Sequence, residues 1–152
     1  MRRDQLTILL AEDDDGHALL VERNLRRAGI TNHIVRVTDG HEALEYVHAQ
    51  GAHARRPRGP LMMLLDIRMP RLDGIEVLRR LKADATTCTI PVVMLTTTDN
   101  PQEISLCYEL GCNVYVTKPV AYDDLMEALR RLSLFLSIVT VPNESRQGGS
   151  VA

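Results

Sequence analysis

The sequence predicts an α/β fold, a parallel sheet with helices on both faces, and three observations lead to this prediction. Short apolar runs alternate five times with longer stretches whose apolar residues recur at helical spacing, as in repeated strand–helix units. Several of these runs are almost continuously apolar, as strands buried on both faces are. Aspartate, asparagine and glycine stand between the runs, where helices begin and end. The length of 152 residues, with 45% apolar and 25% charged residues, suits one globular domain.

The first unit is expected to begin with a continuously apolar strand at Leu6–Ala11. Asp14 or Asp15 can cap the following helix, which is expected to end at Gly29. The inward face of this helix is formed by Ala18, Val21, Leu25 and Ala28. Ile34–Val37 alternates apolar and polar residues, so it is expected to be an edge strand.

The second helix is marked by its apolar positions, which are Ala43, Leu44 and Val47. It leads into Ala49–Pro60 (AQGAHARRPRGP), a stretch without periodicity that is expected to be an unusually long loop. Leu61–Leu65 is the next continuously apolar strand, and Asp73 and Gly74 open the third helix. The core face of that helix is expected to be Val77, Leu78 and Leu81.

The last two units follow the same order. Pro91–Leu95 is the fourth expected strand. Asn100 can cap the next helix, with proline at the first helical position and glutamate at the capping-box position, and this helix is expected to end at Gly111. Val114–Val116 is the fifth strand, and the final helix is expected at Tyr122–Ser137.

The C-terminal part carries more apolar residues than one helix face needs. Residues 1–142 are expected to form the domain with an apolar extension, and residues 143–152 (NESRQGGSVA) a disordered tail. The surplus apolar stripe predicts a symmetric homodimer. Its contact residues are expected to be Leu134, Phe135, Ile138 and Val139. An extension that folds back onto its own domain remains the alternative.

Composition excludes several classes of protein. A net charge of −2 argues against binding of nucleic acid or of an anionic membrane surface. No apolar stretch is long enough to span a bilayer, and the N-terminus (MRRDQLTILLAEDDD) reaches acidic residues too early for a secretory signal. Cys88, Cys107 and Cys112 are odd in number and form no CxxC pair, so neither a disulfide framework nor a zinc site is expected. A cytoplasmic location follows as the expectation.

Polar residues follow four of the five expected strands. Glu12 and Asp13 come after the first strand, Asp66 after the third, Thr96 after the fourth and Lys118 after the fifth. Because ligands of an open parallel sheet bind beyond the carboxyl ends of its strands, these side chains are expected to converge. Taken singly, each has an ordinary alternative, such as a helix cap, a turn residue or a surface lysine. The match at four strand ends favours a common site.

The residue types at this site indicate phosphoryl transfer. Three carboxylates in one cleft need a cation to neutralise them, and hard oxygen ligands suit Mg²⁺. A carboxylate beside Mg²⁺ can accept a phosphoryl group as an acyl phosphate. The cation, a hydroxyl such as that of Thr96, and the Lys118 ammonium would then bind the phosphoryl oxygens.

The segments ILLAEDD, LLDIRMPRLDG, IPVVMLTTT and VYVTKPV resemble, in order and spacing, the receiver domain of two-component response regulators. The resemblance implies a flavodoxin-like (βα)5 fold, a doubly wound parallel sheet with strand order 2-1-3-4-5. It implies that a sensor histidine kinase phosphorylates Asp66, and that the protein is a switch and not an enzyme beyond its own phosphoryl transfer and dephosphorylation. The Mg²⁺ ligands would be Asp13, Asp66 and the backbone carbonyl of Arg68, with Glu12 acting through water.

The resemblance also implies roles for the remaining site residues. Thr96 and Lys118 match the signalling hydroxyl and the phosphate-binding lysine of the family. Tyr115 matches an aromatic residue that turns inward on phosphorylation, and the Lys118–Pro119 bond is expected to be cis. Thr97 is larger than the usual residue at its position, which would restrict access to Asp66.

A narrower resemblance concerns the partner. The long loop at Ala49–Pro60, the lack of an output domain and the apolar ending FLSIVTVP are similar to single-domain regulators paired with bacterial phytochrome kinases. This resemblance implies that the partner kinase is a bacteriophytochrome.

Three alternative functions share parts of this pattern. An aspartyl-nucleophile phosphatase would be expected to carry a DxDx[TV] motif on the first strand and an acidic pair late in the chain. A flavin carrier would need a Ser/Thr/Gly phosphate loop where this chain has Glu-Asp-Asp-Asp, which would repel a phosphate. The intact acidic set argues against a pseudo-receiver that acts only as a binding module.

Overall fold

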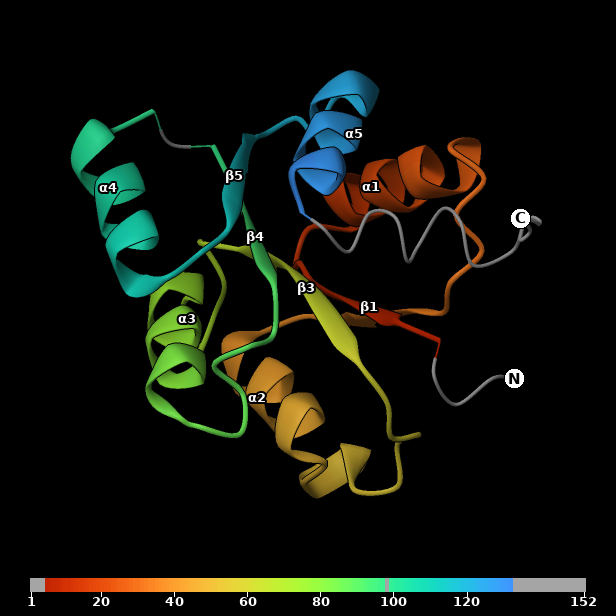
Figure 1. Ribbon diagram of the computed structural model, residues 1–152, viewed down its shortest axis with the longest axis vertical. Coiled ribbons are helices and arrows are strands. Elements are labelled where there is room, and N and C mark those ends of the chain that lie inside the picture. The colour runs from red at the N-terminus through yellow and green to blue at the C-terminus, as the bar shows by residue number, and fades with distance from the viewer. Residues whose placement is uncertain (1–4, 98, 133–152) are drawn as a thin grey trace, which may run out of the picture.

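A computed structural model describes residues 5–97 and 99–132 of the chain (Figure 1). Its sheet has five strands in the order β2-β1-β3-β4-β5, and all neighbouring pairs are parallel. The strands are β1 (Thr7–Ala11), β2 (Ile34–Val37), β3 (Leu61–Asp66), β4 (Val92–Thr96) and β5 (Val114–Thr117). The predicted fold class and strand order are therefore confirmed, with β2 at one edge.

Five α-helices cover the two faces of this sheet. They are α1 (Asp15–Arg27), α2 (Gly40–His48), α3 (Gly74–Ala83), α4 (Pro101–Leu110) and α5 (Tyr122–Arg131). One core cluster joins the sheet to α1 and α5, and a second joins it to α2, α3 and α4 (Figure 1). Along β1, Ile8 and Leu10 belong to the first cluster while Leu9 and Ala11 belong to the second. Because alternate residues of a strand face opposite sides, burial on both faces explains the continuously apolar runs.

The predicted helix ends are confirmed where a capping residue marks them. The side chain of Asp14 accepts a hydrogen bond from the His17 backbone N–H (2.9 Å) at the start of α1. Asp73 and Asn100 cap α3 and α4 in the same way. Gly111 ends α4 with a φ of 108°, a left-handed conformation that glycine adopts without strain.

Two details of the local structure were not predicted. The loop Ala49–Pro60 contains a 3₁₀ helix, η1 (Gly51–His53). The last helix ends at Arg131, earlier than predicted, where the backbone of Leu132 is extended and its N–H bonds the Leu129 carbonyl (3.1 Å); residues 133–137 lie outside the described residues. The turn leaves the Leu132 side chain buried in the core cluster of α1 and α5.

The predicted dimer contacts at Leu134, Phe135, Ile138 and Val139 lie outside the described residues, as does the tail at 143–152. In the described part of the chain, no helix is both long and apolar enough to cross a membrane. All three cysteines are free, and Cys107 and Cys112 are buried. Burial raises the pKa of Cys112 to about 12, which keeps this thiol protonated at neutral pH.

Candidate functional site

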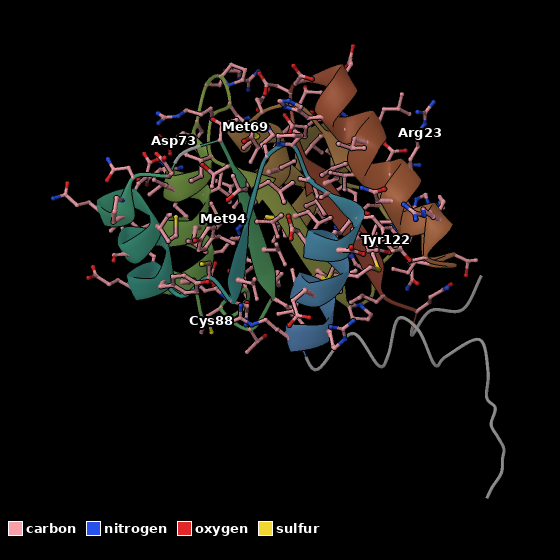
Figure 2. All side chains as sticks on the ribbon, turned by 90° about the horizontal axis from the view of Figure 1, so that it is seen from above. Arg23, Met69, Asp73, Cys88, Met94 and Tyr122 are labelled. Carbon is pink, nitrogen blue, oxygen red and sulfur yellow. The ribbon has the colours of Figure 1, made fainter. Side chains whose placement is uncertain are left out.

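Parallel pairing brings the predicted site residues to one end of the sheet. Asp66 is the last residue of β3 and pairs with Leu95, and Thr96 is the last residue of β4 and pairs with Thr117. The backbone N–H of Lys118 then bonds the Thr96 carbonyl (2.7 Å), which carries the sheet alignment past the end of β5. Figure 2 shows Met69 and Asp73, from the loop after β3, at this end of the molecule and Cys88 at the other.

The three acidic residues lie together as predicted. Glu12, Asp13 and Asp66 each place a carboxylate oxygen within 4.8 Å of the others. Glu12 and Asp66 are buried, and Asp13 is exposed. The Glu12 backbone N–H bonds the Val37 carbonyl (3.0 Å), so the neighbouring strand β2 holds the residue that follows β1.

Lys118 is the cation of the cleft. Its Nζ lies 2.7 Å from Glu12 Oε1 and 3.3 Å from Asp66 Oδ1, and its side chain is buried. The contact with Glu12 is a buried ion pair, so Lys118 is the charge partner of Glu12 Oε1, although no hydrogen bond to this oxygen is present in the described residues.

One ammonium does not balance three carboxylates, and both burial and this excess of negative charge act on Asp66. Burial, followed by the negative charge of Glu12, raises the pKa of Asp66 to about 6, although the positive charge of Lys118 acts in the opposite direction. Hard oxygen donors and excess negative charge together fit a divalent cation such as Mg²⁺.

Thr96 and Tyr115 lie where the sequence predicts them. Thr96 is buried at the end of β4, beside the strand that carries Asp66. Tyr115 is half-buried on β5, and its ring meets the Tyr108 ring of α4 edge-on, with centroids 5.9 Å apart. The Lys118–Pro119 peptide bond is cis, as expected.

The exposed side chain of Arg68 pairs with Glu103 of α4, with 3.5 Å between Nη2 and Oε1. Its backbone carbonyl stays a predicted cation ligand. The sequence did not reveal Arg36 of β2, which donates from Nε to the backbone carbonyl of Glu12 (2.9 Å). The only available signal was its position as the polar residue of the edge strand.

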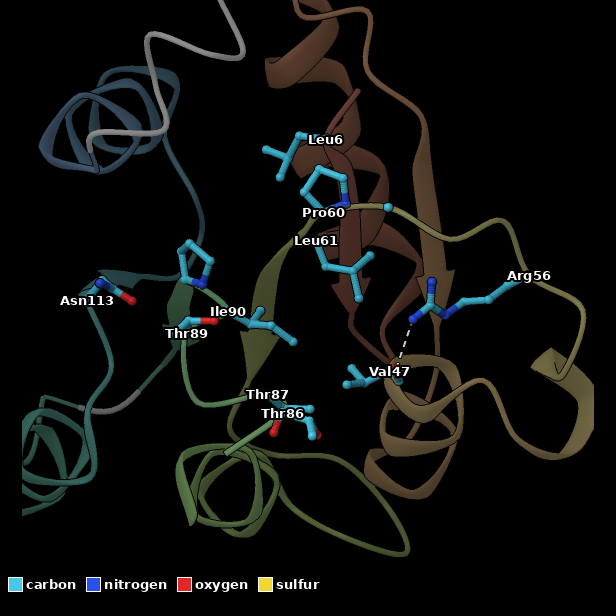
Figure 3. A pocket seen from close by; sticks show the side chains of 12 residues that line it. Leu6, Val47, Arg56, Pro60, Leu61, Thr86, Thr87, Thr89, Ile90 and Asn113 are labelled. Carbon is cyan, nitrogen blue, oxygen red and sulfur yellow. Dashed lines mark hydrogen bonds between the residues drawn. The ribbon is translucent and has the colours of Figure 1, made fainter. Parts of the chain in front are cut away.

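A cavity of about 610 Å³ lies at the opposite end of the sheet, where the strands begin (Figure 3). Its polar residues are used by the protein itself: Thr87 Oγ1 donates to the Leu81 carbonyl (2.7 Å), and Asn113 Oδ1 accepts from the Val92 N–H (2.8 Å). Arg56 donates to the Val47 carbonyl (2.8 Å), a bond drawn in Figure 3. Among the described residues, no carboxylate lines this cavity, so the acidic end of the sheet remains the candidate site.

The fold and the acidic cleft define a protein class that comparison confirms. The model of the response regulator receiver domain family matches residues 8–130, and the chain belongs to this family. Its members are phosphoacceptor modules of two-component systems, in agreement with the resemblance seen in the sequence.

The chain is also similar to an individual response regulator over most of the length of both proteins. Response regulator Rcp1 of Synechocystis sp. is 36% identical over 136 residues, which are 89% of this chain and 92% of Rcp1. The Mn²⁺-bound form of Rcp1 has been solved and matches with a TM-score of 0.72, at 33% identity, over 89% of this chain and 96% of that one.

Two solved phytochrome-associated regulators are similarly close. The bacteriophytochrome response regulator RtBRR matches with a TM-score of 0.82 and 35% identity, over 92% of this chain and 85% of that one. The phosphorylated cyanobacterial phytochrome response regulator RcpA matches with a TM-score of 0.75 and 34% identity, over 91% of this chain and 99% of that one.

Proposed function

We propose that the protein is a phosphorylation switch that accepts a phosphoryl group on Asp66 from a sensor histidine kinase. The observation that carries the proposal is a buried carboxylate, Asp66, beside two further acids and 3.3 Å from a buried ammonium. In the transfer, an Asp66 carboxylate oxygen bonds to phosphorus while the bond from phosphorus to the histidine nitrogen of the donor breaks.

The remaining residues of the cleft have roles that follow from their charge. Glu12, Asp13, Asp66 and the Arg68 carbonyl would hold Mg²⁺, which when bound supplies positive charge to the phosphoryl oxygens. Lys118 and the Thr96 hydroxyl would bind the other phosphoryl oxygens, so the new negative charge is compensated within the buried cleft. The Mn²⁺-bound form of the relative Rcp1 supports a divalent cation here.

The partner kinase is proposed to be a bacteriophytochrome. The support is the likeness to RtBRR, a bacteriophytochrome response regulator, and to RcpA, a phytochrome response regulator whose solved form is phosphorylated. Buried free thiols at Cys107 and Cys112 are compatible with the cytoplasm as the proposed compartment.

A homodimer remains part of the proposal, through Leu134, Phe135, Ile138 and Val139. Light scattering of the whole chain should give twice the mass of 17.0 kDa. Phe135→Asp should give monomers, whereas a whole chain that stays monomeric with and without phosphorylation would remove the dimer from the proposal.

The central test is the site of phosphorylation. Incubation with acetyl phosphate and Mg²⁺ should add the mass of one phosphoryl group, and Asp66→Asn should abolish the addition. Glu76→Gln, which changes a half-buried acid on α3 that pairs with Arg79 and Arg80, should be phosphorylated like the parent. Full phosphorylation of the Asp66→Asn protein would show that the acceptor is another residue.

A further inference from the structure

Unsatisfied polar atoms gather around the acidic loop that follows β1. Within residues 5–97 and 99–132, the buried side-chain atoms without a hydrogen bond are Glu12 Oε1, which forms an ion pair with Lys118, His17 Nδ1 and Arg36 Nη2. Glu12 begins the loop and His17 lies in the first turn of the helix that follows it. Arg36 comes from β2, which lies beside β1 in the sheet. Buried polar atoms without a hydrogen bond are uncommon, so three of them around one loop need a structural explanation.

Arg36 spans this loop with two bonds. Its Nε donates to the backbone carbonyl of Glu12 (2.9 Å), and its Nη1 donates to Asp15 Oδ1 (2.7 Å). Asp13 and Asp14 lie between these two anchoring points in the chain. The Arg36 side chain is 25% exposed and the Asp15 side chain 94% exposed, so the bond to the backbone is the better shielded of the two.

The backbone of the loop is thereby fixed at the acidic pair. The Glu12 N–H bonds β2 through the Val37 carbonyl (3.0 Å), and the Glu12 carbonyl bonds β2 through Arg36 (2.9 Å). Both polar groups of the Glu12 backbone are therefore attached to the edge strand. The planar guanidinium fork supports this two-point contact, which a lysine ammonium on a flexible chain does not reproduce.

We infer that Arg36 is a positioning residue of the divalent-cation site: its fork holds the Glu12–Asp15 loop so that the Glu12 and Asp13 carboxylates face Asp66. The inference rests on the proposed function, because it concerns the cation site of that function. Arg36 contacts no predicted cation-binding carboxylate; it acts on the backbone that carries two of them.

Arg36 has two effects on Mg²⁺ affinity that act in opposite directions, so a measurement of this affinity can test the inference. A fixed positive charge near the cleft repels a bound cation, so its removal by itself would strengthen Mg²⁺ binding. Loss of the fork frees the loop, and the cation must then order it, which weakens binding. We expect the second effect to dominate, because Asp15 already pairs with the Arg36 guanidinium and offsets its charge, whereas the contact with the Glu12 backbone has no substitute.

The experiment measures the Mg²⁺ dissociation constant of the whole chain by calorimetry, at about 0.15 M and about 0.5 M salt. Arg36→Ala should weaken binding about tenfold, the scale seen when groups supporting metal ligands are removed. Arg36→Lys keeps the charge and should recover less than half of this loss on a logarithmic scale. Arg23→Ala removes one exposed charge from α1 and should change the constant less than about twofold.

A second measurement follows the hydrogen bonding of the loop in the absence of the metal. Amide hydrogen exchange at Glu12 and Asp14, whose N–H groups are hydrogen-bonded, should become faster in Arg36→Ala and stay unchanged in Arg23→Ala. Asp15→Asn should give a smaller effect, and adding it to Arg36→Ala should cost little more, since both changes cut the same contact.

The outcomes separate this inference from the proposed function. Binding of Mg²⁺ that is unchanged or tighter in Arg36→Ala overturns the positioning role. Full recovery by Arg36→Lys also overturns it, because charge alone would then suffice. A parent chain that binds no Mg²⁺ contradicts the proposed function, whereas faster exchange at Glu12 in Arg36→Ala would still support the hold of Arg36 on the loop.

Discussion

Gly74 lets helix α3 begin directly behind the proposed phosphoacceptor. A Cβ at this position would lie 2.1 Å from the Asp66 carbonyl oxygen and 2.9 Å from Ile67 Cα. Both atoms belong to the backbone, so no side-chain rotation can relieve the overlap. The Gly74 N–H also bonds the Ile67 carbonyl (2.8 Å). The missing side chain therefore allows the close contact between α3 and the end of β3.

Gly74→Ala is expected to displace the end of β3 and with it the Asp66 carboxylate. Overpacking of this kind costs about 1–3 kcal/mol, and the free energy of unfolding in urea should fall by this amount. Mg²⁺ affinity should fall as well. Gly16→Ala is the matched control, because its Cβ would meet only Asp14 Oδ1 at 3.3 Å, an atom of a movable side chain. If Gly74→Ala were as stable as Gly16→Ala, this result would contradict the close contact between Gly74 and the Asp66 carbonyl.

At the scale of elements, the segment Ala49–Pro60 is ordered by Arg56. The guanidinium lies 4.8 Å from the centre of the Tyr46 ring and donates to the carbonyls of Val47 and Pro57 (both 2.8 Å), as well as to that of Tyr46. Two of these carbonyls belong to the last turn of α2, where a positive charge is favourable. His53 adds a ring contact with Tyr46, at 5.1 Å between centroids.

Arg56→Gln should therefore destabilise the protein, although it lies far from the acidic cleft. The ring contact and the shielded bonds to carbonyls predict a loss of about 1–2 kcal/mol in the free energy of unfolding. Arg58→Gln removes an exposed arginine from the same loop and should cost less than about 0.5 kcal/mol. Mg²⁺ binding should be unchanged in both variants. Equal stability of the two would show that Arg56 does not order the segment.

The sequence predicted those elements whose causes lie within a few neighbouring residues. The buried strands follow from their apolar runs, and Asp14, Asp73 and Asn100 were recognisable as caps. The order within Ala49–Pro60 was not predictable, because contacts of Arg56 with Tyr46 and Val47 of the preceding helix decide it. The role of Arg36 was not predicted for the same reason, since its partners Glu12 and Asp15 lie in the loop that follows another strand. The acidic cleft was predictable because parallel topology alone brings strand ends together.

At the scale of the molecule, β5 connects the cleft to the side of the sheet covered by α4. The Lys118 N–H bonds the Thr96 carbonyl (2.7 Å), so the end of β5 follows the end of β4. Tyr115 lies on the same strand and packs edge-on against Tyr108 of α4, with ring centroids 5.9 Å apart. A displacement at Thr96 can thus reach α4 through a continuous chain of contacts.

Phosphorylation of Asp66 is expected to change this side of the molecule through a shift between two populated states. A dianionic phosphoryl group attracts the Thr96 hydroxyl and competes with Glu12 for the Lys118 ammonium, which lies 2.7 Å from Glu12 Oε1 without the phosphoryl group. Movement of Thr96 would leave room that Tyr115 can fill. Amide exchange measured with and without acetyl phosphate should therefore change in residues 99–111 and at Tyr115, and stay constant in α2.

Tyr108→Ala removes the ring against which Tyr115 packs, so it should reduce the difference at Tyr115 while Asp66 is still phosphorylated. Asp66→Asn should show no difference at all. Changes confined to the neighbourhood of Asp66 in the phosphorylated parent would contradict the coupling through β5.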